Sequence, residues 1–138
     1  MGAQEKHRYS RRFFLDTLTF LWWNTDDPLL SVHAKEIIAD GRNEVFLSAV
    51  SAWEIVLKTA KGRLILPEPP AQYISSRMSL YRFRSLPVQI SHAVHVYELP
   101  PHHNDPFDRM LIAQSRLDSL PLVTNDEDIQ RYDLETIW

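Results

Sequence analysis

The stretch Asn104–Gln114 constrains the fold of this chain more than any other feature of the sequence. It sets Pro106 directly after one aspartate and two residues before another, and then turns apolar at helical spacing. Proline is favoured in the first turn of a helix, because its missing N–H would have no partner there. The pattern therefore predicts a buried helix that begins at Pro106, with Asp105 at its N-cap and Asp108 in its first turn. Acids in these positions lie at the positive end of the helix dipole, where anions and metal-bound groups collect.

Three further acids follow short apolar runs that are typical of buried strands. They are Asp16 after Phe13–Leu15, Glu54 about one turn after Val45–Leu47, and Asp126 after Leu120–Thr124. In an open parallel sheet, the carboxyl ends of the strands form the edge at which ligands bind. We therefore predict that acids far apart in the sequence converge at one edge of the sheet.

The order of apolar runs and helical patterns predicts the fold class. Strands are expected over residues 12–16, 44–47, 85–88, 120–124 and 135–138. Helices are expected over residues 17–24, 31–39, from 48 or 51 to 61, 71–80, 91–99 and 127–132, besides the helix that begins at Pro106. Strands that alternate with helices pack as a three-layer α/β/α domain around a short parallel sheet of about five strands.

Length and composition bound the remaining possibilities. With 138 residues, the chain is long enough for one domain with a core and too short for two. We expect this domain over residues 11–138, after a disordered polar extension over residues 1–10. The absence of cysteine excludes disulfides and thiolate metal sites and fits a reducing cytosol. No apolar run approaches the roughly 20 residues of a membrane helix, and the first residues lack the apolar core of a signal peptide. A net charge of −3 argues against coating nucleic acid through bulk positive charge.

Four segments, taken together and in order, resemble the PIN-domain nucleases and, within them, the VapC-type toxins of toxin–antitoxin pairs. The segments are Phe14–Thr17, Ser48–Ile55, His102–Gln114 and Leu122–Asp126. The resemblance implies a PIN-like fold and a magnesium- or manganese-dependent ribonuclease that acts on RNA in the cytoplasm. It also implies neutralisation by a cognate VapB-like antitoxin and assembly as a homodimer. Plausible antitoxin contacts are the segments Phe20–Trp23 and Tyr73–Phe83.

The same resemblance assigns roles to individual residues. Carried over one by one, the catalytic acids are Asp16, Glu54, Asp108 and Asp126, with Asp105 as an accessory. Many relatives have a histidine two residues after the first aspartate, where this chain has Leu18. We therefore expect no histidine function at that position, whereas the acid cluster is unaffected.

Clustered carboxylates suit the hydrolysis of a phosphodiester. A magnesium ion that is held by carboxylates and keeps some of its waters both activates a water and stabilises charge on the leaving oxygen. Ligation by oxygen alone suits Mg²⁺ or Mn²⁺ better than zinc or copper. We expect Asp16 and Asp108 to bind the principal ion, with Asp126 and Glu54 holding further ligands, positioning the water or binding a second ion. Because neighbouring carboxylates repel one another, the metal-free site should have raised pKa values.

Substrate phosphates need local positive charge. Lys58 and Lys61 follow Glu54 at helical spacing, so all three share one helix face, and Arg63 extends this patch. Arg109 neighbours Asp108 in the sequence. We expect these four cations to guide an RNA backbone past the acids. Single-stranded RNA would also stack on exposed aromatics, for which the sequence offers Trp22, Trp23 and Trp53.

Most of these residues also have a purely structural interpretation. Asp105 could serve only as an N-cap, Asp108 could complement the helix dipole, and Asp126 could belong to a turn. Glu54 could close a capping box with Ser51 and pair with Lys58. Asp16 has no evident structural task at the end of a buried strand. The pair His102–His103 is interpreted as loop residues rather than metal ligands, because no other histidine has suitable spacing.

Two competing functions stay open at this level. The first is a catalytically inactive PIN-like module that only binds RNA or a protein partner. The second is an aspartyl-phosphate protein with Asp16 as nucleophile, but no lysine follows the late strands at Val123 or Thr136 as that chemistry would require. The presence of all four acids favours the nuclease.

Overall fold

A computed structural model describes residues 10–138 of the chain, so the extension predicted over residues 1–10 lies outside the described residues except for its last position. The described part contains a five-stranded sheet in the order β3-β2-β1-β4-β5. Every neighbouring pair of strands in it is parallel. The strands are β1 (Arg12–Leu15), β2 (Glu44–Ser48), β3 (Arg84–Leu86), β4 (Leu122–Val123) and β5 (Thr136–Ile137). The predicted parallel α/β sheet is confirmed.

The central strand β1 shows why these short segments form a sheet. Its residues Phe13, Phe14 and Leu15 are fully buried, and they alternate between the two faces as strand geometry requires. Phe13 and Leu15 belong to one core, which includes Phe20 and Ile55, whereas Phe14 belongs to the other. A strand that is buried on both faces reads as a continuous apolar run, which is how parallel strands appear in a sequence.

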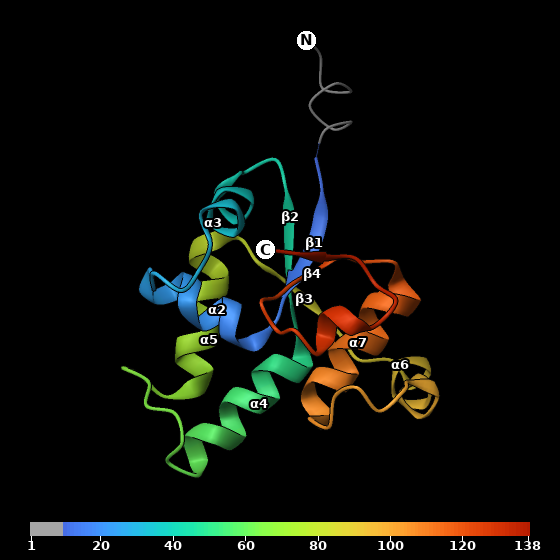
Figure 1. The fold of residues 1–138 in the computed structure, drawn as a ribbon. Helices are drawn as coiled ribbons and strands as arrows, with labels where there is room; N and C mark the ends of the chain where they lie inside the picture. Colours follow the sequence, from blue (N-terminus) through green and yellow to red (C-terminus); the bar gives the residue numbers. More distant parts are fainter. Residues whose placement is uncertain (1–9) are drawn as a thin grey trace.

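Helices cover both faces of the sheet, and one further helix lies at the carboxyl ends of the strands (Figure 1). One face carries α2 (Thr17–Thr25), α3 (Val32–Ala39) and α5 (Pro70–Tyr81), and the other carries α6 (Ile90–His95) and α7 (Pro106–Asp118). The remaining helix, α4 (Ala49–Ala60), lies at the carboxyl end of the strands. Because α4 contributes Ile55 to one core and Val50 to the other, it bridges the two layers just where the strands end.

Several element boundaries differ from those predicted, each for a local reason. The predicted helix over residues 91–99 is split into α6 and a 3₁₀ turn, Val96–Glu98, and the chain then enters the pair Pro100–Pro101. The predicted helix over residues 127–132 is only a 3₁₀ turn, Ile129–Arg131. The predicted strand over residues 85–88 is shorter, because Pro87 cannot donate to the ladder.

Three helices, α2, α4 and α7, begin at the carboxyl ends of the strands, and a side chain caps the start of each. Asp16 caps α2 by accepting from Thr19 N, and Ser48 caps α4 by accepting from Val50 N. Asp105 caps α7 and accepts from the backbone N–H groups of Phe107 and Asp108. Capping oxygens of this kind satisfy N–H groups that a helix start leaves unpaired. The strand ends therefore bring polar side chains to one place for structural reasons alone.

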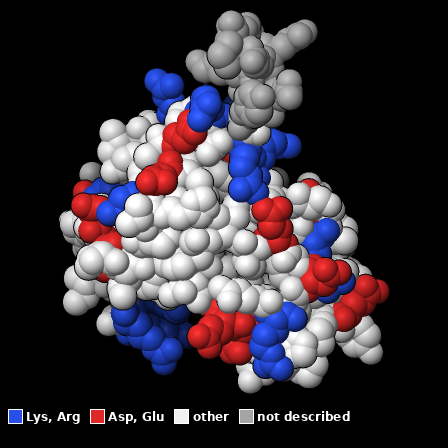
Figure 2. All heavy atoms as spheres, turned by 45° about the horizontal axis from the view of Figure 1, so that its top comes forward, with Lys and Arg blue, Asp and Glu red and all other residues white. Residues whose placement is uncertain are grey.

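On the face shown in Figure 2, neither acidic nor basic side chains form one large patch. They lie in small groups around a broad uncharged area. This agrees with the small net charge of −3. None of the helices between residues 10 and 138 is both long and apolar enough to cross a membrane.

Candidate active site

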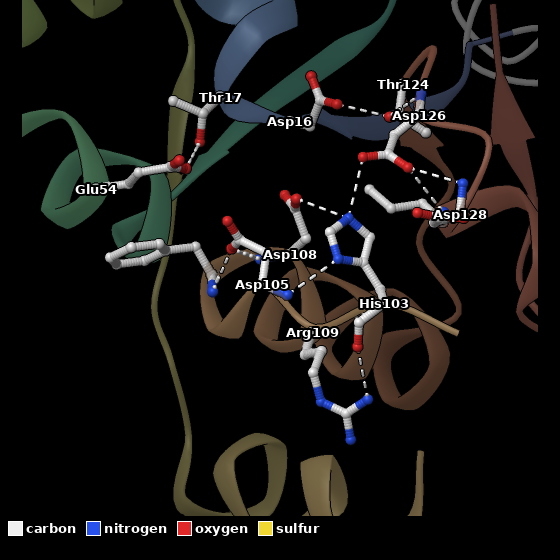
Figure 3. Close-up of polar contacts among 12 residues, drawn as sticks. Asp16, Thr17, Glu54, His103, Asp105, Asp108, Arg109, Thr124, Asp126 and Asp128 are labelled. Atoms are coloured by element: carbon white, nitrogen blue, oxygen red, sulfur yellow. Dashed lines mark hydrogen bonds and ion pairs between the residues drawn. The ribbon is translucent and has the colours of Figure 1, made fainter. Parts of the chain in front are cut away.

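A pocket of about 270 Å³ opens at the carboxyl end of the sheet, between α2, α4 and α7. All five acids singled out in the sequence line it, together with one lysine and several uncharged residues: Asp16, Glu54, Asp105, Asp108, Asp126, Lys58, Thr17, Leu18, Trp22 and Asn125. The five acids come from segments that are far apart in the sequence, and their side chains point toward one another (Figure 3). Lys61, Arg63 and Arg109 do not line this pocket.

Asp16 is the most deeply placed acid of the pocket. Its side chain is almost fully buried, and each carboxylate oxygen accepts a hydrogen bond: Oδ1 from Thr19 N at 2.8 Å and Oδ2 from Thr124 Oγ1 at 2.6 Å. Burial raises the pKa of Asp16 despite these hydrogen bonds, and the nearby charge of Asp126 raises it further. The interpretation that Asp16 has no structural task is wrong, because it caps α2. Capping does not exclude a chemical role, since Oδ2 still borders the pocket.

Asp108 is the second acid of the site whose carboxyl pKa is raised. Its side chain is 21% exposed and lies in the first turn of α7. Burial raises the pKa of Asp108 to about 7, and the negative charges of Asp105, Asp16 and Glu54 add to that increase, whereas His103 opposes it. A carboxyl group that half-titrates near neutral pH marks a site where acids crowd together without a neutralising cation.

His103 is a residue of the site that the sequence interpretation missed. Its ring points into the cluster, and Nε2 lies 3.0 Å from both Asp108 Oδ2 and Asp126 Oδ2 (Figure 3). The two carboxylates therefore lie within two hydrogen-bond lengths of each other. The interpretation of His103 as a loop residue without a site function is thus incomplete: it is in the loop, but it bridges two of the predicted acids. The available signal was its position just before the Asp105–Asp108 motif.

The hydrogen bonds around His103 decide which ring nitrogen carries the proton. Nδ1 accepts from the backbone N–H of Asp105 at 3.1 Å, so in the neutral ring the proton is on Nε2. Nε2 then donates to Asp126, lies 3.0 Å from Asp108 Oδ2, and has no lone pair to offer a metal. Although the facing atoms of His103, Asp126 and Asp128 lie within 4.8 Å of one another, they do not form a metal site in this arrangement.

Asp126 combines a structural contact and a pocket contact in one carboxylate. Oδ1 accepts from the backbone N–H groups of Asp128 at 2.8 Å and Ile129 at 3.1 Å, which closes the turn after β4. Oδ2 is free of these bonds and faces His103 at 3.0 Å. The backbone N–H of Asp126 donates to Thr124 Oγ1, the same hydroxyl that donates to Asp16. Thr124 therefore couples the positions of the two acids.

Glu54 is buried, and its two oxygens have different partners. Oε1 accepts from Thr17 Oγ1 at 2.5 Å, and Oε2 forms an ion pair with Lys58 one turn later on α4. Of the two candidate caps, Ser48 and Ser51, it is Ser48 that caps this helix, so the alternative of a capping box between Ser51 and Glu54 is wrong. The predicted pairing with Lys58 is present, and it fixes the ammonium group at the rim of the pocket.

Arg109 points away from the acids (Figure 3). Its terminal nitrogens donate to four backbone carbonyls, at 3.0–3.2 Å, and to one phenolic oxygen at 3.3 Å: Val96, Leu99, Pro100, His103 and the hydroxyl of Tyr132. This guanidinium is occupied by the loop that precedes α7. Arg109 therefore holds the segment that carries His103, and its donors are not directed at the pocket.

The donor set of the pocket fits a hard divalent cation. It consists of carboxylate oxygens, which Mg²⁺ and Mn²⁺ prefer, and it contains no thiolate. Burial raises the pKa values of Asp16 and Asp108, and neighbouring negative charges raise them further. A bound cation would relieve that repulsion.

Comparisons with known proteins agree with the fold and the motifs. The sequence model of the PIN domain matches residues 13–135. A segment of 59 residues is 42% identical to Ribonuclease VapC16 of Mycobacterium tuberculosis, a match that covers 43% of this chain and only 40% of that protein.

Solved structures show the same fold at low sequence identity. DNA-bound VapBC from Salmonella typhimurium is similar with a TM-score of 0.68 at 18% identity, over 92% of this chain and 97% of that one. VapBC2 from Rickettsia felis, bound to a promoter DNA fragment, is similar with a TM-score of 0.67 at 15% identity, over 92% and 98%. FitAcB from Neisseria gonorrhoeae gives a TM-score of 0.62 at 20% identity, over 91% and 96%.

Proposed function

The chain belongs to the PIN-domain family, and we propose that it is a metal-dependent endoribonuclease and the toxin of a toxin–antitoxin pair. The observation that carries this proposal is the single pocket lined by Asp16, Glu54, Asp105, Asp108 and Asp126. The likeness of a segment to a VapC ribonuclease supports the choice of RNA as substrate.

In this proposal three of the acids bind the metal ion and Glu54 orients the attacking water. Asp16, Asp108 and Asp126 would hold Mg²⁺ or Mn²⁺, which supplies an activated water and stabilises charge on the leaving oxygen. Thr124 fixes Asp16 and Asp126 relative to each other, and Thr17 fixes Glu54. With its position held in this way, Glu54 orients the water that attacks phosphorus. In the attack the water would lose one proton to solvent and form a P–O bond while the bond to the leaving ribose oxygen breaks, and that oxygen would take up one proton from solvent.

Lys58 is the cation best situated for the substrate phosphate. It lines the pocket, whereas Lys61 and Arg63 lie beyond the end of α4, where they could contact the RNA backbone further along. Arg109 is not assigned to the substrate, because its donors are engaged by the loop before α7. It acts instead as a positioning residue for that loop.

One observation favours the alternative of a non-catalytic PIN-like module. Lys58 pairs with Glu54, and His103 bridges Asp108 and Asp126, so three of the acids already have partners within the chain. If these contacts persisted with metal present, the pocket would bind RNA or protein without cleaving it. A metal-dependent nuclease requires that a cation displace the His103 bridge.

RNA cleavage decides between these two functions. A labelled single-stranded RNA is incubated with the protein in Mg²⁺, in EDTA, and with the variant Asp16→Asn. Asparagine caps a helix as well as aspartate does, so this variant keeps the bond to Thr19. It removes the charge and replaces the oxygen that accepts from Thr124 with an amide nitrogen. The matched control is Asp133→Asn, an exposed acid outside the pocket. Cleavage by the wild type and the control in Mg²⁺ alone supports the nuclease, and equal activity in all conditions excludes it.

We further propose a VapB-like antitoxin partner, a homodimer and a cytoplasmic location. Two of the similar structures, from Rickettsia felis and Salmonella typhimurium, are VapBC complexes, which supports the partner. The exposed residues of the segments Phe20–Trp23 and Tyr73–Phe83 would contact it. Phe20, Tyr73 and Phe83 are themselves buried in the core, whereas Leu80 is 68% exposed. Co-purification with the product of the neighbouring gene tests the partner. We expect Leu80→Glu to reduce complex formation without changing the melting temperature, and an unchanged complex would contradict this surface.

A further inference from the structure

A second cavity lies beside the acid pocket. It is an apolar groove of about 380 Å³ between α4, α6 and the start of α7. Its lining contains mostly apolar and aromatic side chains: Val50, Trp53, Ala93, Val96, Asn104, Pro106, Phe107, Arg109 and Met110. This volume lies within the range of cavities that bind small molecules. Apart from the stacking on Trp53 that the sequence suggested, none of the roles proposed so far uses this groove.

The groove and the acid pocket share their walls. On α4, Glu54 lines the acid pocket and its neighbour Trp53 lines the groove. At the start of α7, Asp108 lines the acid pocket and Phe107 lines the groove. Likewise, Asp105 lines the acid pocket, whereas its neighbours Asn104 and Pro106 line the groove. The two cavities therefore adjoin along α4 and the start of α7.

Two aromatic rings form the open side of the groove. Trp53 is 59% exposed, and its ring centroid lies 5.2 Å from that of Phe107 at an interplanar angle of 73°. In this edge-to-face pair, Phe107 holds the indole in place and leaves most of Trp53 accessible. An exposed, orientationally fixed indole is the surface on which an unpaired base stacks.

The charge of the groove indicates a neutral ligand. Arg109 is its one charged lining residue, and that guanidinium is occupied by carbonyls such as those of Val96 and His103. The groove therefore offers no free cation to a phosphate and no acid to a basic peptide. The side-chain amide of Asn104 provides a donor and an acceptor at the rim, and within residues 10–138 it makes no hydrogen bond. An apolar slot with one amide matches the face and the edge of a nucleobase.

We propose that this groove binds an unpaired base of the RNA substrate, next to the cleaved phosphate, with the base stacked on Trp53 and its edge facing Asn104. The proposal rests on the proposed ribonuclease function, because that function brings the RNA to the shared wall. The groove then contributes affinity for single-stranded RNA and disfavours a base that is paired in a duplex.

Binding measurements in EDTA test the groove without requiring cleavage. Fluorescence anisotropy compares a short single-stranded RNA with wild type, Trp53→Ala and Trp53→Phe, and the control is Tyr97→Ala, an aromatic that is 94% exposed and lies outside the groove. Loss of one stacked base should weaken binding about ten- to a hundredfold in Trp53→Ala, and less in Trp53→Phe. Tyr97→Ala should bind as the wild type does. Wild-type affinity in Trp53→Ala would overturn the proposal.

An RNA with a single abasic position identifies the occupant. Moved along the oligonucleotide, the abasic position should weaken binding to the wild type at one place only, and Trp53→Ala should be insensitive to it there. If instead Trp53→Ala loses the homodimer or the antitoxin complex while its RNA affinity is unchanged, the groove is a protein interface and the base site is refuted. Because the readout is binding, a wild type that binds RNA through the groove but does not cleave it refutes only the nuclease.

Discussion

Replacing Asp108 by asparagine is expected to stabilise the metal-free protein at pH 8. The pKa of Asp108 is raised to about 7, chiefly by burial, so the folded state binds this proton more tightly than the unfolded state does. A raised carboxyl pKa lowers stability as the pH increases from the unfolded value toward the folded value. Folding stability in EDTA should therefore fall between about pH 4 and 7, and the charge of Asp108 is one cause.

The size of the effect follows from the two pKa values. The difference between 3.8 and about 7 corresponds to about 4 kcal/mol at pH 8, where the carboxylate is ionised in both states. Asparagine removes that cost, but it also removes the 3.0 Å ion pair with His103. We therefore expect a net gain of about 1–3 kcal/mol, or about 3–10 °C in melting temperature for a domain of this size.

Urea unfolding in EDTA at pH 5 and pH 8 measures this prediction. The gain in unfolding free energy of Asp108→Asn over the wild type should be large at pH 8. It should be small at pH 5, where Asp108 is protonated in the folded wild type. The matched control Asp133→Asn, at an exposed position outside the pocket, should show no such difference. Added Mg²⁺ should stabilise the wild type more than Asp108→Asn. A destabilised variant at pH 8, or a gain equal at both pH values, would refute the reasoning.

Three further changes probe the scaffold of the site. Arg109→Ala should cost about 2–4 kcal/mol of unfolding free energy in urea, because it removes one donor from each of four backbone carbonyls, two of which (Val96 and Pro100) keep a second donor. A loss below the error of the fit would contradict the role of Arg109 in holding the loop. Thr124→Val should weaken Mn²⁺ binding about tenfold by calorimetry, since it removes the hydroxyl that aligns Asp16, and an unchanged affinity would count against that link. Ser48→Ala should cost about 1–3 kcal/mol of unfolding free energy, because it removes a helix cap and the 2.6 Å bond to Gln114, and a neutral result would show that neither matters.

Features that depend on local chemistry could be predicted from the sequence. The start of α7 is encoded by Pro106 and the capping oxygen of Asp105, and both act within one turn of the helix. The buried strand β1 is encoded by its unbroken apolar run, which only a strand covered on both faces tolerates. Once the parallel sheet is inferred, the acids at its carboxyl edge follow from topology.

Contacts that depend on the path of a loop could not be predicted in this way. His103 enters the site because Arg109 and Tyr132 hold the loop after Pro100, and these partners are far apart in the sequence. A pattern of residue types carries no information about such a path. The direction of the Arg109 side chain depends on the same loop. For this reason, the position of Arg109 next to Asp108 in the sequence did not predict which groups it contacts.

Structural and chemical interpretations of one residue proved compatible rather than exclusive. Asp16 and Asp105 both cap helices, and both line the pocket. A capping carboxylate has a second oxygen or a second lone pair, so satisfying a helix start still leaves a ligand for the pocket. The roles of these acids in metal binding and catalysis stay predictions.

Direct titration with Mn²⁺ tests whether acids that are far apart in the sequence bind one ion together. Electron paramagnetic resonance of free Mn²⁺ gives the affinity of the wild type, Asp16→Asn, Asp126→Asn and the control Asp133→Asn. We predict one shared site whose affinity falls at least about tenfold in each of the two pocket variants and is unchanged in the control. Wild-type affinity in either pocket variant, with the fold intact, would contradict the account.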